Sequence, residues 1–174
     1  MKRLALAAAA GFSLLLSAPA SLQAADTGGC DSFSFPVATD LQWMRSPDAE
    51  PLSDGAKLAS LPAKAMLVTL KPVADVTYAV PPGGKSKDGE PAFGAVLELP
   101  SGVAAGLYQV SLSAKGWIDV AQGGAPLKAV AHSGKSDCEA MRKSVRFDVE
   151  DGPLTLQLSG ISAREIKVTI RKAD

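Results

Sequence analysis

One short stretch of the sequence brings together most of the side-chain types that do chemistry in proteins. It runs from His132, which is the only histidine, to Cys138, and Arg142 and Arg146 follow closely. Imidazole, thiolate and carboxylate groups serve as metal ligands and as general acids or bases. If the protein has a functional site, we expect it in this stretch and in the strands on either side.

The histidine count argues against catalysis at a metal. An open catalytic zinc site uses three protein ligands, usually with at least one or two histidines, and His132 has no second histidine to join it. Together with Asp137, and with Asp119 or Asp31, it predicts no more than a weak, adventitious metal site. We therefore expect neither a metal nor another cofactor.

Nucleophilic hydrolysis would need a serine that a histidine activates and a carboxylate orients. Ser133 lies next to His132, but the chain contains no Gly-x-Ser-x-Gly elbow. A pair of carboxylates for glycoside cleavage is equally unsupported, because the acidic residues are scattered over predicted turns and strand ends. We expect no catalytic residue, and a small hydrolase based on Ser133 and His132 is the alternative.

Ligand binding is better supported. If Ile118 and Val120 face the core, then Trp117 and Asp119 share the opposite face of the same strand. An exposed indole beside a carboxylate suits a sugar or a flat cation, whereas the alternative is a Trp117 that fills the core or an edge. The complete absence of asparagine and an aromatic content of 5% weaken the sugar interpretation.

A second candidate surface is basic. Alternation along residues 142–146 points Arg142 and Arg146 together to solvent, with Lys143 and Val145 on the other side, and Lys135 adds a cation from the preceding loop. These groups could hold an anion, or they could be ordinary solvated side chains paired with acidic residues nearby, such as Asp148 and Glu150. The candidate binding residues are therefore Trp117, Asp119, His132, Lys135, Asp137, Arg142 and Arg146.

The elements that must position these residues are predicted to be strands. The clearest alternation places Tyr108, Val110 and Leu112 on a core face, with Gln109, Ser111 and Ser113 on a solvated face. Similar runs predict strands near residues 33–37, 66–70, 76–80, 93–99, 117–120, 145–149, 154–158 and 166–170. A further apolar run passes through Leu127 and Val130, and residues 41–44 predict a loop or helical turn. Eight or nine short strands without a convincing helix predict an all-β fold, an antiparallel β-sandwich of jelly-roll type.

The first 24 residues have the pattern of a secretory signal peptide, with cleavage after Ala24 and a competing position after Ala20. We therefore expect a periplasmic or secreted protein. Export to an oxidising compartment predicts one disulfide between Cys30 and Cys138, with two free thiols as the alternative. The remaining 150 residues suit one domain, in which an irregular segment at 25–62 packs on a β-sandwich at 63–174.

The charge balance argues against some partners. Loss of Lys2 and Arg3 with the signal peptide lowers the 18 basic residues to 16, against 18 acidic residues. This balance does not predict nucleic-acid binding, and beyond the signal peptide no apolar run reaches the length of a transmembrane anchor. The polar loop at 81–91 is expected to be an excursion between strands of this one domain.

Two resemblances add to this interpretation. Residues 105–113, 117–120 and 152–160 resemble strands of exported β-sandwich modules, such as bacterial pre-peptidase C-terminal domains and carbohydrate-binding modules, which implies a sandwich fold and a non-catalytic role. Residues 132–147 resemble a group of small exported proteobacterial proteins, some of which are named homogentisate 1,2-dioxygenases. Such ring cleavage uses iron held by two histidines and a carboxylate, and this sequence offers His132 alone.

The sequence therefore predicts an exported, non-catalytic binding or accessory protein of the bacterial envelope. Its partner would be a protein, a polysaccharide or a small anionic ligand. A purely structural accessory role, and an enzyme of either the dioxygenase or the hydrolase kind, are the competing hypotheses.

Overall fold

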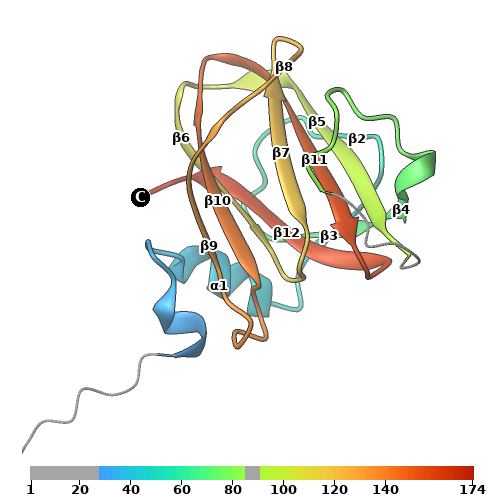
Figure 1. Cartoon of the computed structure of the whole chain (residues 1–174). Coiled ribbons are helices and arrows are strands. Elements are labelled where there is room, and N and C mark those ends of the chain that lie inside the picture. The colour runs from blue at the N-terminus through green and yellow to red at the C-terminus, as the bar shows by residue number, and fades with distance from the viewer. Residues whose placement is uncertain (1–27, 85–90) are drawn as a thin grey trace, which may run out of the picture.

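Two β-sheets packed against each other form the body of the protein (Figure 1). The computed structural model describes residues 28–84 and 91–174. The predicted signal peptide, and residues 85–90 of the polar loop predicted at 81–91, lie outside the described residues.

The first sheet, called sheet A here, has six strands. In spatial order they are β1 (Glu50–Ser53), β3 (Met66–Thr69), β12 (Glu165–Lys172), β6 (Gly106–Leu112), β10 (Lys143–Val149) and β9 (Ala129–Gly134). All neighbours are antiparallel except β1 and β3, which run parallel. The outermost strand β9 has a bulge opposite Arg146 and Phe147, where the register against β10 shifts and Val130 has no partner in the ladder.

The second sheet, sheet B, also has six strands. In spatial order they are β2 (Ala56–Lys57), β5 (Phe93–Val103), β11 (Gly152–Ile161), β7 (Trp117–Gln122) and β8 (Ala125–Pro126), and β4 (Lys71–Pro72) pairs with β5 as well. Only β2 and β5 are parallel. The core between the two sheets takes one side of each long strand, with Val110, Leu156 and Ile170 fully buried, as the period-two pattern predicts.

The all-β prediction is therefore confirmed, with two differences. The sheets are mixed rather than fully antiparallel, because β1 and β2 each join their sheet in parallel. Both strands come from residues 50–57, where the sequence predicts an irregular segment. The jelly-roll connectivity stays a prediction.

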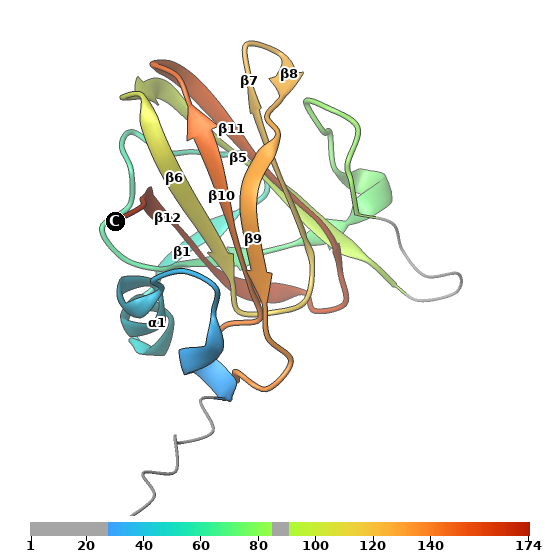
Figure 2. The ribbon, with the colours of Figure 1, turned by 60° about the vertical axis from the view of Figure 1, so that its left-hand side comes forward.

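A segment that we call the cap, residues 28–46, covers the outer face of sheet A. It contains the 3-10 turn η1 (Gly29–Ser32) and the helix α1 (Ala38–Arg45), which lies beside β12 in both views (Figures 1 and 2). The expected strand at 33–37 is wrong, and the expected helical turn at 41–44 is part of this helix. An eight-residue helix is marginal in isolation, so contacts with the sheet must stabilise it.

Local chemistry explains where α1 sits and where it ends. Asp40, Leu41 and Met44 form its buried face, as spacings of three and four residues require on a helix. The acidic Asp40 lies in the first turn and Arg45 in the last, each at the end that the helix dipole favours. The helix stops at Ser46, whose backbone is extended because Pro47 follows it.

A second segment, the strap at residues 76–84, crosses the outer face of sheet B. The expected strand at 76–80 is wrong, because side chains of the sheet bind the strap instead of a backbone ladder. Gln157 accepts hydrogen bonds from the backbone N–H groups of Ala79 (2.6 Å) and Val80 (3.0 Å) and donates one to the carbonyl of Val80 (3.0 Å). Tyr78 donates to the carbonyl of Leu158 (3.1 Å), and burial, aided by nearby carboxylates, raises the pKa of Tyr78 to about 12.

The predicted disulfide between Cys30 and Cys138 is present, so neither cysteine is free. It joins η1 of the cap to the loop between β9 and β10. Around it lies a small second core of Val37, Leu41 and Met141, separate from the core between the sheets. The disulfide and this cluster together hold the start of the cap against sheet A.

Replacing both cysteines by serine should strongly destabilise the protein. The bond links residues 108 positions apart, and for a loop of this length the chain-entropy account gives a loss of about 4–5 kcal/mol. Urea unfolding of the double variant and of the wild type, each with and without reductant, measures this loss. Reductant should weaken the wild type only, and a double variant within about 1 kcal/mol of the oxidised wild type would contradict the expectation.

Candidate functional site

A small pocket opens where the edges of the two sheets meet. It has a volume of about 180 Å³ and is lined by Trp117 and Ile118 of β7, Ala129 and His132 of β9, and Lys143 and Val145 of β10. We call it the edge pocket. It contains two of the residues that the sequence singles out, Trp117 and His132, and its walls are otherwise mainly apolar.

Trp117 begins β7 and lies on the outward face that the alternation of the strand predicts. Its side chain is 44% exposed, while Ile118 and Val120 on the other face of the strand are almost fully buried. Of the two parts of the alternative, a Trp117 inside the core is wrong, whereas a Trp117 at an edge agrees with its position in the edge pocket. The ammonium nitrogen of Lys143 lies 4.5 Å from the centre of the indole ring, which is cation–π distance.

Asp119 shares the outward face with Trp117, but its carboxylate is already engaged. One oxygen accepts a hydrogen bond from the indole N–H of Trp117 (2.9 Å), and the other accepts one from the backbone N–H of Gly83 in the strap (2.9 Å). A side chain at Gly83 would overlap the indole, so glycine is needed at this close approach. Asp119 therefore fixes Trp117 and the strap in place.

Lys143 is a charged residue of the pocket that was not among the binding residues predicted from the sequence. It is half-buried and donates a hydrogen bond to the carbonyl of Gly116 (3.0 Å). Burial lowers the pKa of Lys143, and the nearby charge of Asp119 opposes part of that shift. The signal was present in the alternation, since Lys143 shares a strand face with the core residue Val145, but a lysine at the end of a strand is usually solvated.

His132 and Ser133 point to opposite sides of β9. His132 is exposed at the edge pocket, whereas Ser133 is buried against the cap, where its hydroxyl oxygen accepts a hydrogen bond from the backbone N–H of Ser34 (3.1 Å). Successive side chains of a strand alternate between its two faces. In the described part of the chain, no hydrogen bond joins this serine to this histidine.

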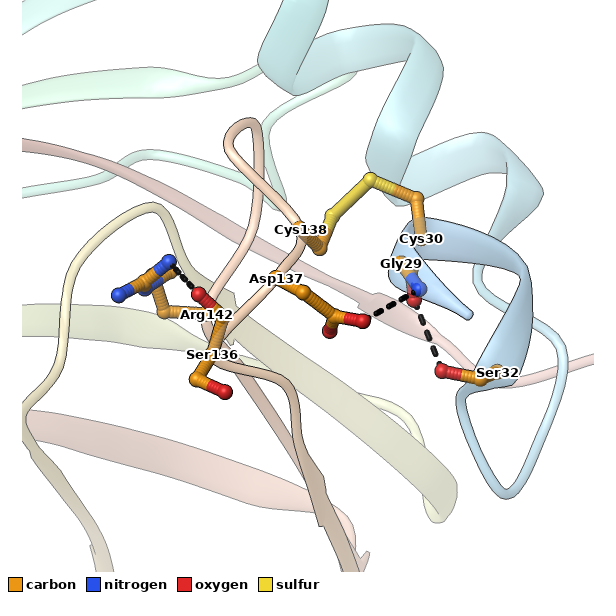
Figure 3. The surroundings of a disulfide bond; sticks show 7 residues. All are labelled: Gly29, Cys30, Ser32, Ser136, Asp137, Cys138 and Arg142. Atoms are coloured by element: carbon orange, nitrogen blue, oxygen red, sulfur yellow. Dashed lines mark hydrogen bonds between the residues drawn. A yellow bond between two sulfur atoms is a disulfide. The ribbon is translucent and has the colours of Figure 1, made fainter. Parts of the chain in front are cut away.

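The loop that carries the disulfide holds three of the remaining candidates, of which Figure 3 shows Asp137 and Arg142. The carboxylate of Asp137 accepts a hydrogen bond from the backbone N–H of Gly29 (2.7 Å), and this bond is the main cause of a lowered pKa of Asp137. Arg142 donates to the carbonyl of Ser136, and the backbone of Lys135 donates to the carbonyl of Arg142 (3.0 Å). Asp137 and Arg142 thus hold the loop beside the disulfide.

Arg146 lies elsewhere, on the outer face of sheet A under the cap. Its Nε donates to Gln109 (2.8 Å), and its guanidinium stacks on the ring of Phe35 at 4.2 Å. The expectation that Arg142 and Arg146 point to solvent together is therefore wrong for Arg146. The same is true of the expected solvated face of β6, because Gln109 and Ser111 are fully buried beneath the cap.

The predicted site residues thus divide among three places: the edge pocket, the disulfide loop and the face under the cap. Within residues 28–84 and 91–174, no three His, Cys, Asp or Glu side chains gather in a group that could hold a metal ion. Over the same residues, no helix is long and apolar enough to cross a membrane.

Comparisons with protein-family models, curated proteins and solved structures found no match to this chain. The fold and the disulfide place this protein in a broad class, the all-β proteins with two packed sheets and one disulfide. The resemblances drawn from the sequence stay predictions.

Replacing Asp119 by alanine should loosen both Trp117 and the strap, because two hydrogen bonds are lost together. We expect a red-shifted emission of Trp117 and a stability loss of about 1 kcal/mol for these solvent-accessible bonds. Fluorescence and urea unfolding in a Trp43→Phe background, which leaves a single tryptophan, measure both. Asp148→Ala on exposed β10 surface is the matched control, and equal behaviour of the two variants would refute the role given to Asp119.

Proposed function

We propose that this protein is an exported, non-catalytic binding protein whose ligand is a small, mainly apolar anion held in the edge pocket. The observation that carries the proposal is the ammonium group of Lys143 beside the apolar side chains of Ile118 and Val145. Within the described residues, Lys143 has no acidic partner at ion-pair distance. A ligand carboxylate would supply the partner that a half-buried cation lacks.

The size of the pocket limits the ligand. A volume of about 180 Å³ is close to the roughly 150 Å³ of a cavity that accepts benzene, and it is well below the 300–1,000 Å³ typical of drug-sized ligands. The apolar part of the ligand should therefore be one ring or a short alkyl chain. His132 at the mouth offers a further hydrogen-bonding group to the anionic end.

Two competing ligands fit the geometry less well. A sugar would need a free indole face to stack on, whereas the Lys143 ammonium and the backbone at Gly83 already lie against the Trp117 ring. A protein strand added to β9 would meet the bulge at Val130, which interrupts the row of backbone groups at this edge. The enzyme alternatives both require His132, so His132→Ala should abolish any activity, whereas binding, which relies on Lys143, should weaken but persist.

The test compares anions with neutral molecules of the same shape. Hexanoate and benzoate should bind the mature wild-type protein at least about tenfold more tightly than hexanol and benzyl alcohol, because a hydrogen bond to a charged group contributes about 1.5–3 kcal/mol. Lys143→Met should abolish this preference, and Lys115→Met, at an exposed lysine, should keep it. Titration calorimetry measures each constant, and no preference for the anions in the wild type would reject the proposal.

Binding of the anion should weaken at alkaline pH. Hexanoate is fully charged from neutral pH upward, so only the loss of the proton from Lys143 removes the attraction. Since burial lowers the pKa of Lys143 from 10.5, the affinity should fall at a lower pH than it would for a solvent-exposed lysine. Affinities for hexanoate and hexanol measured from neutral to alkaline pH check this expectation, and the affinity for hexanol should not change. A pH-independent affinity for hexanoate would contradict the role of the Lys143 ammonium.

A further inference from the structure

The cap inserts a single carboxylate into the outer face of sheet A. Asp40 of α1 is fully buried, and each of its oxygens accepts two hydrogen bonds. Ser111 (2.9 Å) and Thr169 (2.6 Å) donate to one oxygen, and Gln109 (2.7 Å) and Arg171 (2.8 Å) donate to the other. All four donors belong to the neighbouring strands β6 and β12, and none belongs to the cap.

Contacts within the sheet and the C-terminus hold these donors in position. The guanidinium of Arg171 donates to both carboxylate oxygens of Asp174 (3.1 Å each) and to the carbonyl of Lys172 (2.8 Å). Gln109 accepts a hydrogen bond from Arg146 (2.8 Å), which orients its amide nitrogen toward the cap, where it donates to Asp40 and to the carbonyl of Pro36 (3.3 Å). The hydroxyl groups of Ser111 and Ser144 lie 2.9 Å apart and share a hydrogen bond.

A buried donor that loses its acceptor is unfavourable. Removal of Asp40 would leave the Arg171 Nε without its acceptor, although the guanidinium keeps its bonds to Asp174. Here the four donors form a preorganised cluster that comes from the sheet alone. The cap has other anchors as well, which are the disulfide, the apolar contacts of Leu41, and the hydrogen bonds from Lys167 to the carbonyls of Met44 (2.8 Å) and Ser46 (2.6 Å). The cap can therefore stay attached when the Asp40 side chain is removed.

We propose that Gln109, Ser111, Thr169 and Arg171 form a carboxylate-binding site in their own right, which the chain fills with its own Asp40 and which accepts a small free carboxylate when that side chain is absent. This site is separate from the edge pocket, and it does not depend on the proposed function. Its ligand class is set by four donors that converge on the two oxygens of one carboxylate.

The test uses the fit between the void and the added ion. Asp40→Ala removes only the carboxylate, so formate should fill the void, whereas Asp40→Gly also removes the Cβ, so acetate should fit better. Formate at about 100 mM should raise the melting temperature of Asp40→Ala by about 5 °C beyond its effect on the wild type, as expected for millimolar binding. Sodium chloride at equal ionic strength corrects for general salt effects.

Three comparisons control the experiment. Asp48→Ala removes an exposed carboxylate near the end of the cap, which pairs with Lys64, and this variant should respond to formate no more than the wild type. Adding Arg171→Met to Asp40→Ala should abolish the response. The order of the two ions should reverse between Asp40→Ala and Asp40→Gly.

The proposal fails if formate stabilises Asp40→Ala no more than it stabilises the wild type, or if Asp40→Ala and Asp40→Gly prefer the same ion. Should Asp40→Ala not fold in chloride, refolding from urea in formate decides the matter. Recovery of folded protein in formate alone supports the site, and an absence of recovery in both salts overturns it. Neither result bears on the affinity of the edge pocket for hexanoate.

Discussion

One constraint shapes the arrangement of this protein: polar side chains on the outer faces of both sheets are buried under another segment of the chain, as the contact between Asp40 and Arg171 illustrates. Sheet A has its inner face against the main core and its outer face under the cap, so polar side chains on the outer face lie away from water. Buried polar groups of this kind must find partners within the protein. One carboxylate from the cap satisfies a serine, a threonine, a glutamine and an arginine at once, and this fixes the position of α1 over the sheet.

On the outer face of sheet B, buried polar side chains find their partners in backbone groups and not in a carboxylate. Its outer face is crossed by the strap, whose backbone groups are bound by the side chains of Gln157, Ser159 and Asp119. Backbone binding requires close approach, which explains why Gly83 and Gly84 lie where the strap meets Trp117 and Ser159. The cap and the strap thus cover the outer faces of the two sheets. Two large apolar side chains, Trp117 of β7 and Val130 of β9, remain exposed where the edges of the sheets meet.

The sequence predicted the long strands well, because their period-two pattern reflects burial on the core side, as at Tyr108, Val110 and Leu112. It failed where a second segment covers the opposite side. Gln109 and Ser111 look solvated in the sequence, and a polar side chain gives the same pattern whether water or Asp40 is its partner. The alternation of Val76, Tyr78 and Val80 was likewise real, but these residues pack on a sheet and do not join one.

The same limit applies to the candidate site. Trp117 and Asp119 were correctly placed on one strand face, since neighbouring positions decide that. Their partners Lys143 and Gly83 come from distant parts of the chain, and no local pattern connects them. The predicted gathering of charges between His132 and Cys138 separates in space, because strand alternation sends His132 and Ser133 to opposite sides and the disulfide draws Asp137 toward Gly29.

The disulfide also divides the chain into two parts that differ in whether a cut in the backbone releases a fragment. Together with the backbone from Cys30 to Cys138 it closes a ring that contains the cap, the strap and strands β1 to β9. A single proteolytic cut inside this ring leaves both fragments bonded to each other. Strands β10, β11 and β12 lie outside it, and each is an interior strand with a neighbour on either side, so the part of the chain that a nick could release is the part most completely enclosed by pairing.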